Sequence, residues 1–160
     1  LIHILMGGSP LRLTLHSDLG LRLLMHRALL NDELLTISDS AAQLSVSRNH
    51  LTKVALALVQ GDWVASHRGR NGGLQLKKPA RDIALGQVVR ELETGSALVA
   101  CFPGGSGLCV LSPACRLKQV LAQAQEAFFE ALNGHSLADL VQGNAGLRAL
   151  LLDVKKSAHA

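Results

Sequence analysis

The sequence has very few aromatic residues: they make up 2% of its 160 residues, and tyrosine is absent. Many RNA-binding and single-strand-binding modules stack bases on aromatic side chains, so this scarcity disfavours both classes. Hydrophobic residues nevertheless make up 48% of the chain, which argues against disorder and predicts a core of Leu, Val, Ala and Ile. The length fits one domain, or one domain with an oligomerisation extension.

Long apolar runs are also missing, and none approaches the ~20 residues that cross a bilayer. The apolar segment Leu1–Met6 has no basic region before it and is too short for a signal peptide, so residues 1–10 are interpreted as an extension or tag remnant. We therefore expect a cytoplasmic protein with no membrane partner. The net charge of +4 permits a polyanionic partner without requiring one.

Cysteines are few, and the three present, Cys101, Cys109 and Cys115, include no Cys-x-x-Cys pair of the kind that marks a structural zinc site. In a cytoplasmic setting they are more often reduced, metal-bound or redox-active than disulfide-bonded. The glycines and Pro103 between them let the chain turn back so that three thiolates converge. This pattern suits a soft-metal or iron–sulfur site with a fourth ligand from elsewhere. Three unrelated thiols, one or two of them simply buried, are the alternative.

The middle of the chain predicts a helix-turn-helix. N-cap-type residues, Thr36 and Ser38, precede a short helix over 39–44. After a tight turn, Ser47 opens a second helix that reaches about Gln60. Apolar residues recur at helical spacing on this second helix, and its buried face is expected to hold Leu51, Val54, Ala55, Leu58 and Val59.

The first turns of the second helix carry donor-rich side chains, as a recognition helix does where it enters the major groove. The DNA-contact candidates on this helix are Ser47, Arg48, Asn49, His50 and Lys53, of which Arg48, Asn49 and His50 are expected to read bases.

Two alternating segments around a glycine-rich turn, between residues 63 and 76, then predict a β-hairpin wing. The wing candidates are His67, Arg68, Arg70 and Asn71, with the two arginines expected to contact phosphate or the minor groove. An amphipathic core helix with a solvated polar face is the alternative for the recognition helix. It is less favoured because the short helix, the turn, the second helix and the basic hairpin occur in this order.

One helix is predicted before this unit and one directly after it. Ser17 caps the first, which runs from Asp18 to about Leu30, and a carboxylate such as Asp18 is favoured in the first turn by the helix dipole. The helix that follows the wing covers 83–93. Together these segments predict a winged helix-turn-helix DNA-binding domain over residues 11–93.

The rest of the chain predicts a loop and a long helix, so the fold class is mainly α with a small β-wing. The glycine-rich residues 94–115 form a cysteine-bearing loop, and Ser112-Pro113 is a helix-start signal. The long helix runs to about Leu132, and with a short terminal helix it makes a dimerisation region over 113–142. Its apolar residues repeat every three or four positions, a heptad-like seam whose length favours pairing with a second subunit: Leu117, Leu121, Ala124, Phe128 and Ala131. The tail from Asn144 is interpreted as a weak amphipathic end.

Several stretches resemble the winged-helix iron–sulfur transcriptional regulator family that includes the nitric-oxide-sensing repressor (NsrR) and the iron–sulfur cluster biogenesis regulator (IscR). They are LRLTLHSDLGLRLLM near the start, VSRNHLTKV in the recognition helix, RGRNGGLQLKKPARDIALGQVVRELE through the wing and the next helix, and the three cysteines. The resemblance covers about Leu11 to Val141, and RGRNGGLQL is its most specific part.

This resemblance implies a homodimeric regulator on palindromic double-stranded DNA, with the long helices crossing at the interface. It implies an iron–sulfur cluster, 4Fe–4S or 2Fe–2S, on the three cysteines. In the nitric-oxide-sensing branch the fourth ligand is an aspartate in the first helix of the partner subunit, and Asp18 matches that position. In the biogenesis branch it is a histidine three residues after the last cysteine, where this chain has Lys118, so the nitric-oxide branch is closer. His16 and His26 are fallback ligands.

The sequence therefore predicts a DNA-binding repressor that senses nitric oxide, or redox or iron status, through an iron–sulfur cluster. A thiol- or ligand-responsive winged-helix regulator without a cluster is the alternative. An enzyme is disfavoured, because no nucleophile–base pair, phosphate loop or pair of carboxylates stands in a recognisable motif. A protein-binding adaptor is disfavoured by the basic helix start and wing.

Overall fold

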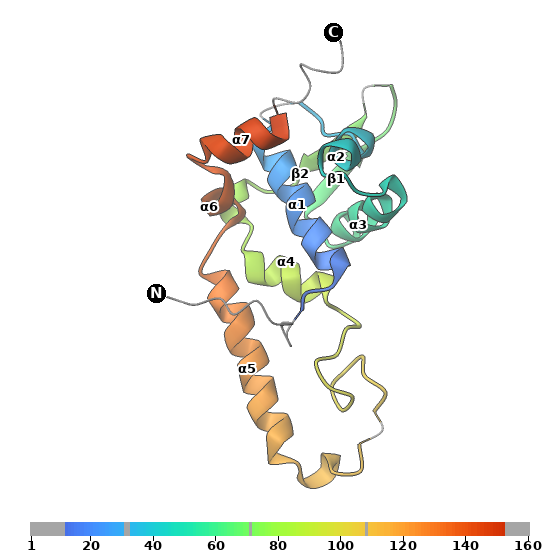
Figure 1. The fold of residues 1–160 in the computed structure, drawn as a ribbon, viewed down its shortest axis with the longest axis vertical. Helices are drawn as coiled ribbons and strands as arrows, with labels where there is room; N and C mark the ends of the chain where they lie inside the picture. Colours follow the sequence, from blue (N-terminus) through green and yellow to red (C-terminus); the bar gives the residue numbers. More distant parts are fainter. Residues whose placement is uncertain (1–11, 31–32, 71, 108, 153–160) are drawn as a thin grey trace.

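The computed structural model describes residues 12–30, 33–70, 72–107 and 109–152 (Figure 1). Within this part of the chain no helix is both long and apolar enough to cross a membrane. The fold is mainly helical with one small antiparallel sheet, which confirms the predicted winged helix-turn-helix class. Residues 1–10, interpreted above as an extension, lie outside the described residues. In chain order the elements are α1 (Leu15–Leu29), α2 (Ile37–Gln43), α3 (Arg48–Gln60), β1 (Val64–His67), β2 (Gly73–Leu76), η1 (Ala80–Asp82), α4 (Leu85–Leu92), η2 (Ser112–Ala114), α5 (Arg116–Asn133), α6 (Leu137–Val141) and α7 (Ala145–Leu152).

The central helix of the fold is α1, which packs against α3, α4 and α6. Its inner face carries Leu19, Leu23 and Leu24, which are all buried and recur at helical spacing. Gly20 lets α4 approach closely, because a Cβ at this position would lie 2.4 Å from Cδ1 of Leu92. The elements before and after the helix-turn-helix therefore share one core around α1.

Two helices begin earlier than predicted, because a threonine caps each of them. Thr14, and not Ser17, caps α1: its hydroxyl accepts the Ser17 N–H at 3.2 Å, while Ser17 lies buried within the first turn. Thr36 caps α2 by accepting the Asp39 N–H at 3.0 Å, which places Ser38 inside the helix. Helix α1 thus starts before Ser17, the cap that the sequence favoured. Helix α2 starts before Ser38, which the sequence favoured no less than Thr36.

The helix α4 begins at Leu85, two residues later than predicted. The residues before it are extended: Ala84 pairs with Ser136 in an isolated β-bridge, and the Leu137 N–H donates to the Ile83 carbonyl at 2.9 Å. This pairing anchors the start of α6, which Ser136 caps.

The long helix α5 begins at Arg116 rather than at Pro113. Ser112-Pro113 does open a helical segment, but it is the 3-10 turn η2, and Cys115 with ψ of 104° separates it from α5. The C-terminal half of α5 packs closely on α4, where a Cβ on Gly86 would lie 2.2 Å from the Phe129 carbonyl oxygen. Figure 1 shows the N-terminal half of α5 extending away from the rest of the molecule.

The segment between α4 and α5 is irregular, as predicted, and Phe102 is the only buried side chain among its described residues. Gly104 and Gly107 have positive φ angles of 85° and 71°. The chain doubles back beside them, and a Cβ on Gly105 would lie 2.4 Å from the Ala100 carbonyl oxygen. This segment, residues 94–115, is called the cysteine loop below.

Candidate nucleic-acid interface and cysteine loop

The helices α2 and α3 form the predicted helix-turn-helix. Ser45 makes the turn with a positive φ of 53°, and the Val46 N–H donates to the Ala41 carbonyl at 3.0 Å. Val46, in the same turn, packs against the core. The predicted inner face of α3 is buried at Leu51, Val54, Ala55 and Leu58, while Val59 is half-buried.

The opposite side of α3 is polar and exposed in its first turns. Arg48, Asn49 and His50 follow the N-cap residue Ser47, and Lys53 lies about one turn further on; all five are exposed. The Ser47 side chain makes no capping hydrogen bond to the helix. The N-terminus of α3 therefore presents donor side chains together with the positive end of its helix dipole.

The wing is the hairpin of β1 and β2, paired from Val64 with Leu76 to His67 with Gly73. Its tip is tight, because a Cβ on Gly72 would lie 2.3 Å from the His67 carbonyl oxygen. Leu35 extends this sheet through a bridge to Leu74, with N–H to carbonyl distances of 3.2 and 2.8 Å, a pairing not predicted from the sequence. The bridge fixes the wing to the segment that enters α2.

The candidate residues of the wing lie at and beside this tip. His67 is exposed, and its Nε2 lies 3.0 Å from Oε1 of Gln75 on the opposite strand. Arg68 and Arg70 are exposed. Asn71 lies outside the described residues.

The cations of α3 and the wing take no part in the ion pairs that the structure shows. Within residues 12–30, 33–70, 72–107 and 109–152, none of the ion pairs involves Arg48, Lys53, Arg68 or Arg70. These side chains are therefore available to an external anion such as a phosphate backbone. Figure 1 shows α2, α3 and the hairpin together on one side of α1, and the cysteine loop leaving the C-terminal end of α4.

The three cysteines are free and half-buried. Cys101 and Cys109 lie in the cysteine loop, and Cys115 joins η2 to α5. Cys115 also lines an open, largely apolar hollow of about 320 Å³ together with Val110 and Leu111, which are 95% and 67% exposed. The chain thus carries three free thiols, and the one at Cys115 lies beside apolar surface that is exposed among the described residues.

The donor set fits an iron–sulfur cluster in its chemistry, because thiolates are the soft ligands that such clusters take. In the described part of the single chain, however, no three or more His, Cys, Asp or Glu side chains come together as a metal ion requires. Within the described residues of one chain, the convergence predicted from the glycine-rich spacing is therefore not present.

Asp18 lies in the first turn of α1, where its half-exposed carboxylate pairs with Arg22 one turn later at 2.9 Å. The carboxylate is accessible from outside the chain. Any ligand role for Asp18 therefore has to share its carboxylate with Arg22 or displace this pair.

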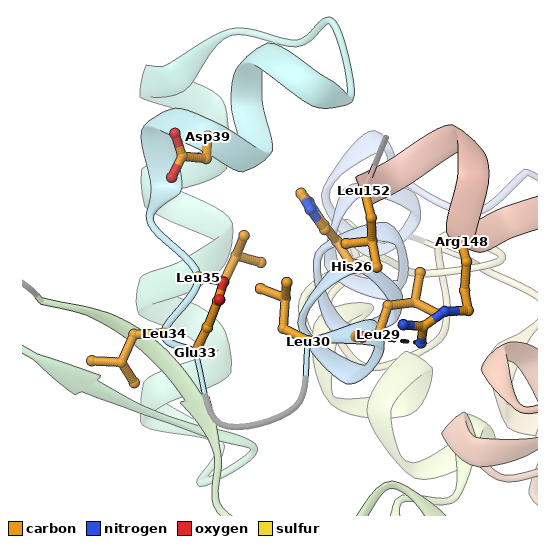
Figure 2. A pocket seen from close by; sticks show the side chains of 9 residues that line it. All are labelled: His26, Leu29, Leu30, Glu33, Leu34, Leu35, Asp39, Arg148 and Leu152. Carbon is orange, nitrogen blue, oxygen red and sulfur yellow. Dashed lines mark hydrogen bonds between the residues drawn. The ribbon is translucent and has the colours of Figure 1, made fainter. Parts of the chain in front are cut away.

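The fallback histidines lie on α1. His16 is half-buried, whereas His26 is buried and its Nδ1 lies 3.1 Å from the Ser40 hydroxyl, which joins α1 to α2. Figure 2 shows His26 in the wall of a small pocket of about 250 Å³ between α1, the entry to α2 and α7. No cysteine lines this pocket; its residues are His26, Leu29, Leu30, Glu33, Leu34, Leu35, Asp39, Arg148 and Leu152. His26 therefore supports the packing of the helix-turn-helix.

The helix α7 closes one side of the same pocket and is more regular than the weak end predicted for the tail. Its Arg148 donates to the Leu29 carbonyl at 3.3 Å, and the Gln43 side chain donates to the Leu150 carbonyl. The pocket is thus framed by contacts that fasten the tail to α1 and α2.

Sequence reasoning missed two polar contacts at the end of α4. Glu91 accepts the Trp63 indole N–H at 2.8 Å, and Glu93 accepts the Thr14 N–H at 2.8 Å and its hydroxyl at 2.9 Å. Burial raises the pKa of Glu93, but hydrogen bonds from Ser17 and Thr14 outweigh it and hold the pKa below its ordinary value. The only sequence signal is a charged run at a helix end, which in most proteins is a solvated face.

Comparisons with known proteins agree with this architecture. Residues 13–143 match the Rrf2 family, described as an iron-dependent transcriptional regulator. Over 142 residues the chain is 42% identical to the HTH-type transcriptional regulator NsrR of Geobacillus kaustophilus (strain HTA426), covering 88% of this chain and 97% of that protein. The fold is similar to that of CymR (YrzC), the global cysteine regulator of B. subtilis, with a TM-score of 0.64, 22% identity, and 82% and 96% of the two chains covered. It is also similar to T. potens IscR, with a TM-score of 0.66, 21% identity, and 86% and 91% covered. The chain belongs to the Rrf2 family of transcriptional regulators.

Proposed function

We propose that this protein is a repressor that binds palindromic double-stranded DNA as a homodimer and responds to nitric oxide, or to redox or iron status, through an iron–sulfur cluster. One arrangement carries the proposal. The exposed cations of α3 and the wing stand on one side of the fold, and three free cysteines stand on a loop that begins where α4 ends. The DNA-reading surface lies on α3 and the wing, the thiol-bearing loop follows α4, and both α3 and α4 pack against α1.

The DNA-reading roles follow from position on α3 and the wing. Arg48, Asn49 and His50 stand in the first turn of α3, where side chains reach base edges in the major groove. Arg68 and Arg70 stand at the wing and contact phosphates or the minor groove. Ser47, Lys53, His67 and Asn71 flank these groups as further contacts. A two-fold dimer repeats the set, with the recognition helices about 34 Å apart for successive major grooves.

The homodimer is supported by apolar surface that the chain leaves open. On α5, Phe129 is buried against α4, while the seam predicted from the sequence stays accessible, with Leu117 and Phe128 62% and 43% exposed. Exposed apolar residues at coiled-coil spacing on a long helix are typical of a helix pair between subunits. The seam of a second copy has the matching spacing by symmetry.

Cys101, Cys109 and Cys115 are the residues that would hold the cluster, with the partner subunit's Asp18 as the fourth ligand. When bound, the cluster supplies iron that reacts with nitric oxide. The chain's own residues supply three thiolates on a loop whose glycines allow it to close, and an Asp18 carboxylate that pairs with Arg22 within one chain. Closing the loop displaces the segment that leads directly out of α4.

The proposal is tested by an anaerobic visible spectrum with iron and sulfide counts, before and after stoichiometric nitric oxide, on the full chain. DNA binding is followed in parallel with a duplex selected from a random pool by the protein itself. We expect a visible band that nitric oxide bleaches, together with a loss of DNA affinity, and we expect Cys101→Ser to abolish both. Nitric-oxide-sensitive DNA binding that survives Cys101→Ser would contradict the proposal.

A second candidate is a thiol- or ligand-responsive regulator on the same fold without a cluster. It is favoured by the absence of a gathered metal-type group in the described residues and by the three free thiols. Under this reading, protein purified anaerobically is colourless and iron-free, and a thiol oxidant changes its DNA affinity. The same spectrum and metal counts decide between the two candidates.

A further inference from the structure

Four consecutive residues at the end of α4 contact three different parts of the fold. We call residues 90–93 the Arg90–Glu93 turn, and the cysteine loop begins at the next residue. The buried positions of α4 include Val88, Val89 and Leu92, so of these four residues only Leu92 belongs to the core. The other three are polar, and each makes a directed contact with another element.

Glu91 reaches the point where the recognition helix passes into the wing. Its carboxylate lies so close to Gly61, the C-cap of α3, that a Cβ on Gly61 would stand 2.1 Å from Oε1. Its other oxygen, Oε2, accepts the indole N–H of Trp63 at 2.8 Å. Trp63 is buried and directly precedes β1. One carboxylate therefore touches both the end of α3 and the base of the wing.

Arg90 reaches in another direction, toward α5. Its two terminal nitrogens donate to the two carboxylate oxygens of Glu126 at 2.8 and 2.6 Å, and its guanidinium lies 4.3 Å from the centre of the Phe129 ring. The same turn thus holds the helix that carries the proposed dimer seam.

Leu92 and Glu93 reach α1. The Leu92 side chain lies against Gly20, and Glu93 accepts two hydrogen bonds from Thr14, the N-cap residue of the helix that carries Asp18. If the cysteine loop moves and displaces residues 90–93, the movement therefore acts on α5, on α1 and on the α3–wing junction.

We propose that Glu91 is a positioning residue that transmits the state of the cysteine loop to the recognition helix and the wing. This inference rests on the proposed function. A carboxylate near the C-terminus of α3 faces the unfavourable end of that helix dipole, so its position is held by the directed bond from Trp63 rather than by general electrostatics. Because Gly61 leaves no room for movement toward α3, a shift of α4 at Glu91 pushes on the α3–wing junction directly.

The test compares DNA affinity in two states of the full chain: the cluster-loaded protein and the same protein after stoichiometric nitric oxide. The coupling ratio is the Kd after nitric oxide divided by the Kd before it, measured on the selected duplex. The variants are Glu91→Ala, which removes the acceptor, and Glu91→Gln, which keeps an acceptor for the Trp63 N–H. Glu33→Ala is the matched control, because it removes the same charge from an exposed residue beside the His26 pocket.

We expect Glu91→Ala to lower the coupling ratio at least threefold while the visible spectrum of the cluster is unchanged. Glu91→Gln and Glu33→Ala should keep the wild-type ratio. Fluorescence of Trp63, the only tryptophan in the chain, reports whether its buried environment survives each substitution. Equal ratios in Glu91→Ala and wild type would overturn the inference and leave the proposed function standing, whereas a wild-type ratio of one would contradict the proposed function itself.

A second variant keeps the inference testable if Glu91→Ala does not fold. Gly61→Ala approaches the same contact from the other side: its Cβ displaces the flexible Glu91 carboxylate, and the φ of −77° at this position allows alanine. We expect the same loss of coupling with both glutamate oxygens still present. A Gly61→Ala protein that folds and keeps the wild-type ratio would overturn the inference.

Discussion

Removing one wing arginine should change how DNA binding depends on salt more than which sequence is bound. Arg70 is exposed at the wing and takes part in none of the ion pairs among the described residues, so Arg70→Ala removes a cation and disturbs no contact that the structure shows. If Arg70 neutralises one phosphate, each wing contributes about 0.9 to the slope of log K against log salt. A dimer with two wings loses about 1.8.

The change in slope gives a measurable difference between the Kd values of the variant and the wild type. Between about 50 and 200 mM salt, the ratio of the variant's Kd to the wild type's should narrow about twelvefold, because the lost contact matters most at low salt. The assay is fluorescence anisotropy on the selected duplex and on a scrambled one. Arg81→Ala is the control: Arg81 is exposed on η1, which packs against α6. An unchanged slope, or a loss confined to the selected duplex, would refute a phosphate-contact role.

Three further predictions concern stability. Phe129→Ala should lower the free energy of unfolding by about 3–5 kcal/mol in urea denaturation, since Phe129 is buried between α4 and α5. Phe128→Ala should instead weaken self-association, measured by sedimentation, because Phe128 is exposed. Gly86→Ala should cost about 1–3 kcal/mol, because the clash with the Phe129 carbonyl outweighs the gain of about 0.5–1 kcal/mol in helix propensity; a stabilised variant would contradict the close α4–α5 packing. The pKa of Glu93 is lower in the folded state than its unfolded value of about 4.3, so the ionised Glu93 stabilises the fold at neutral pH. This stabilisation is lost as the pH falls through the folded-state pKa. The difference in unfolding free energy between wild type and Glu93→Gln should therefore shrink from pH 7 to pH 3.

The helices and the wing were predictable where one local signal dominates. The periodicity of Leu51, Val54, Ala55 and Leu58 defines the inner face of α3, and the glycine-rich turn after His67 defines the hairpin. Helix starts failed where two candidates compete within a few residues. Thr14 caps α1 and is also bound through its backbone N–H and its hydroxyl by Glu93, 79 positions away, a contact that no local rule contains.

The candidate site was predictable to a similar depth. The donor-rich start of α3 and the three cysteines are local patterns, and the structure places the former on an exposed surface and the latter on an irregular loop. The bridge from Leu35 to Leu74 and the bond from Trp63 to Glu91 join residues that are distant in sequence. Such contacts depend on how the elements pack, and side-chain type alone gives no sign of them.

The small contribution of the cysteine loop to the core has an evolutionary consequence. Its described residues bury Phe102 alone, while α4 and α5 hold each other through Gly86, Phe129 and the Arg90–Glu126 pair on either side of it. The free-energy cost of closing a loop rises only by about 0.6 kcal/mol for each doubling of its length. The length and the residues of this loop can therefore change in evolution at little cost to the stability of the fold. New input signals can arise in the loop while the DNA-binding part of the protein stays the same.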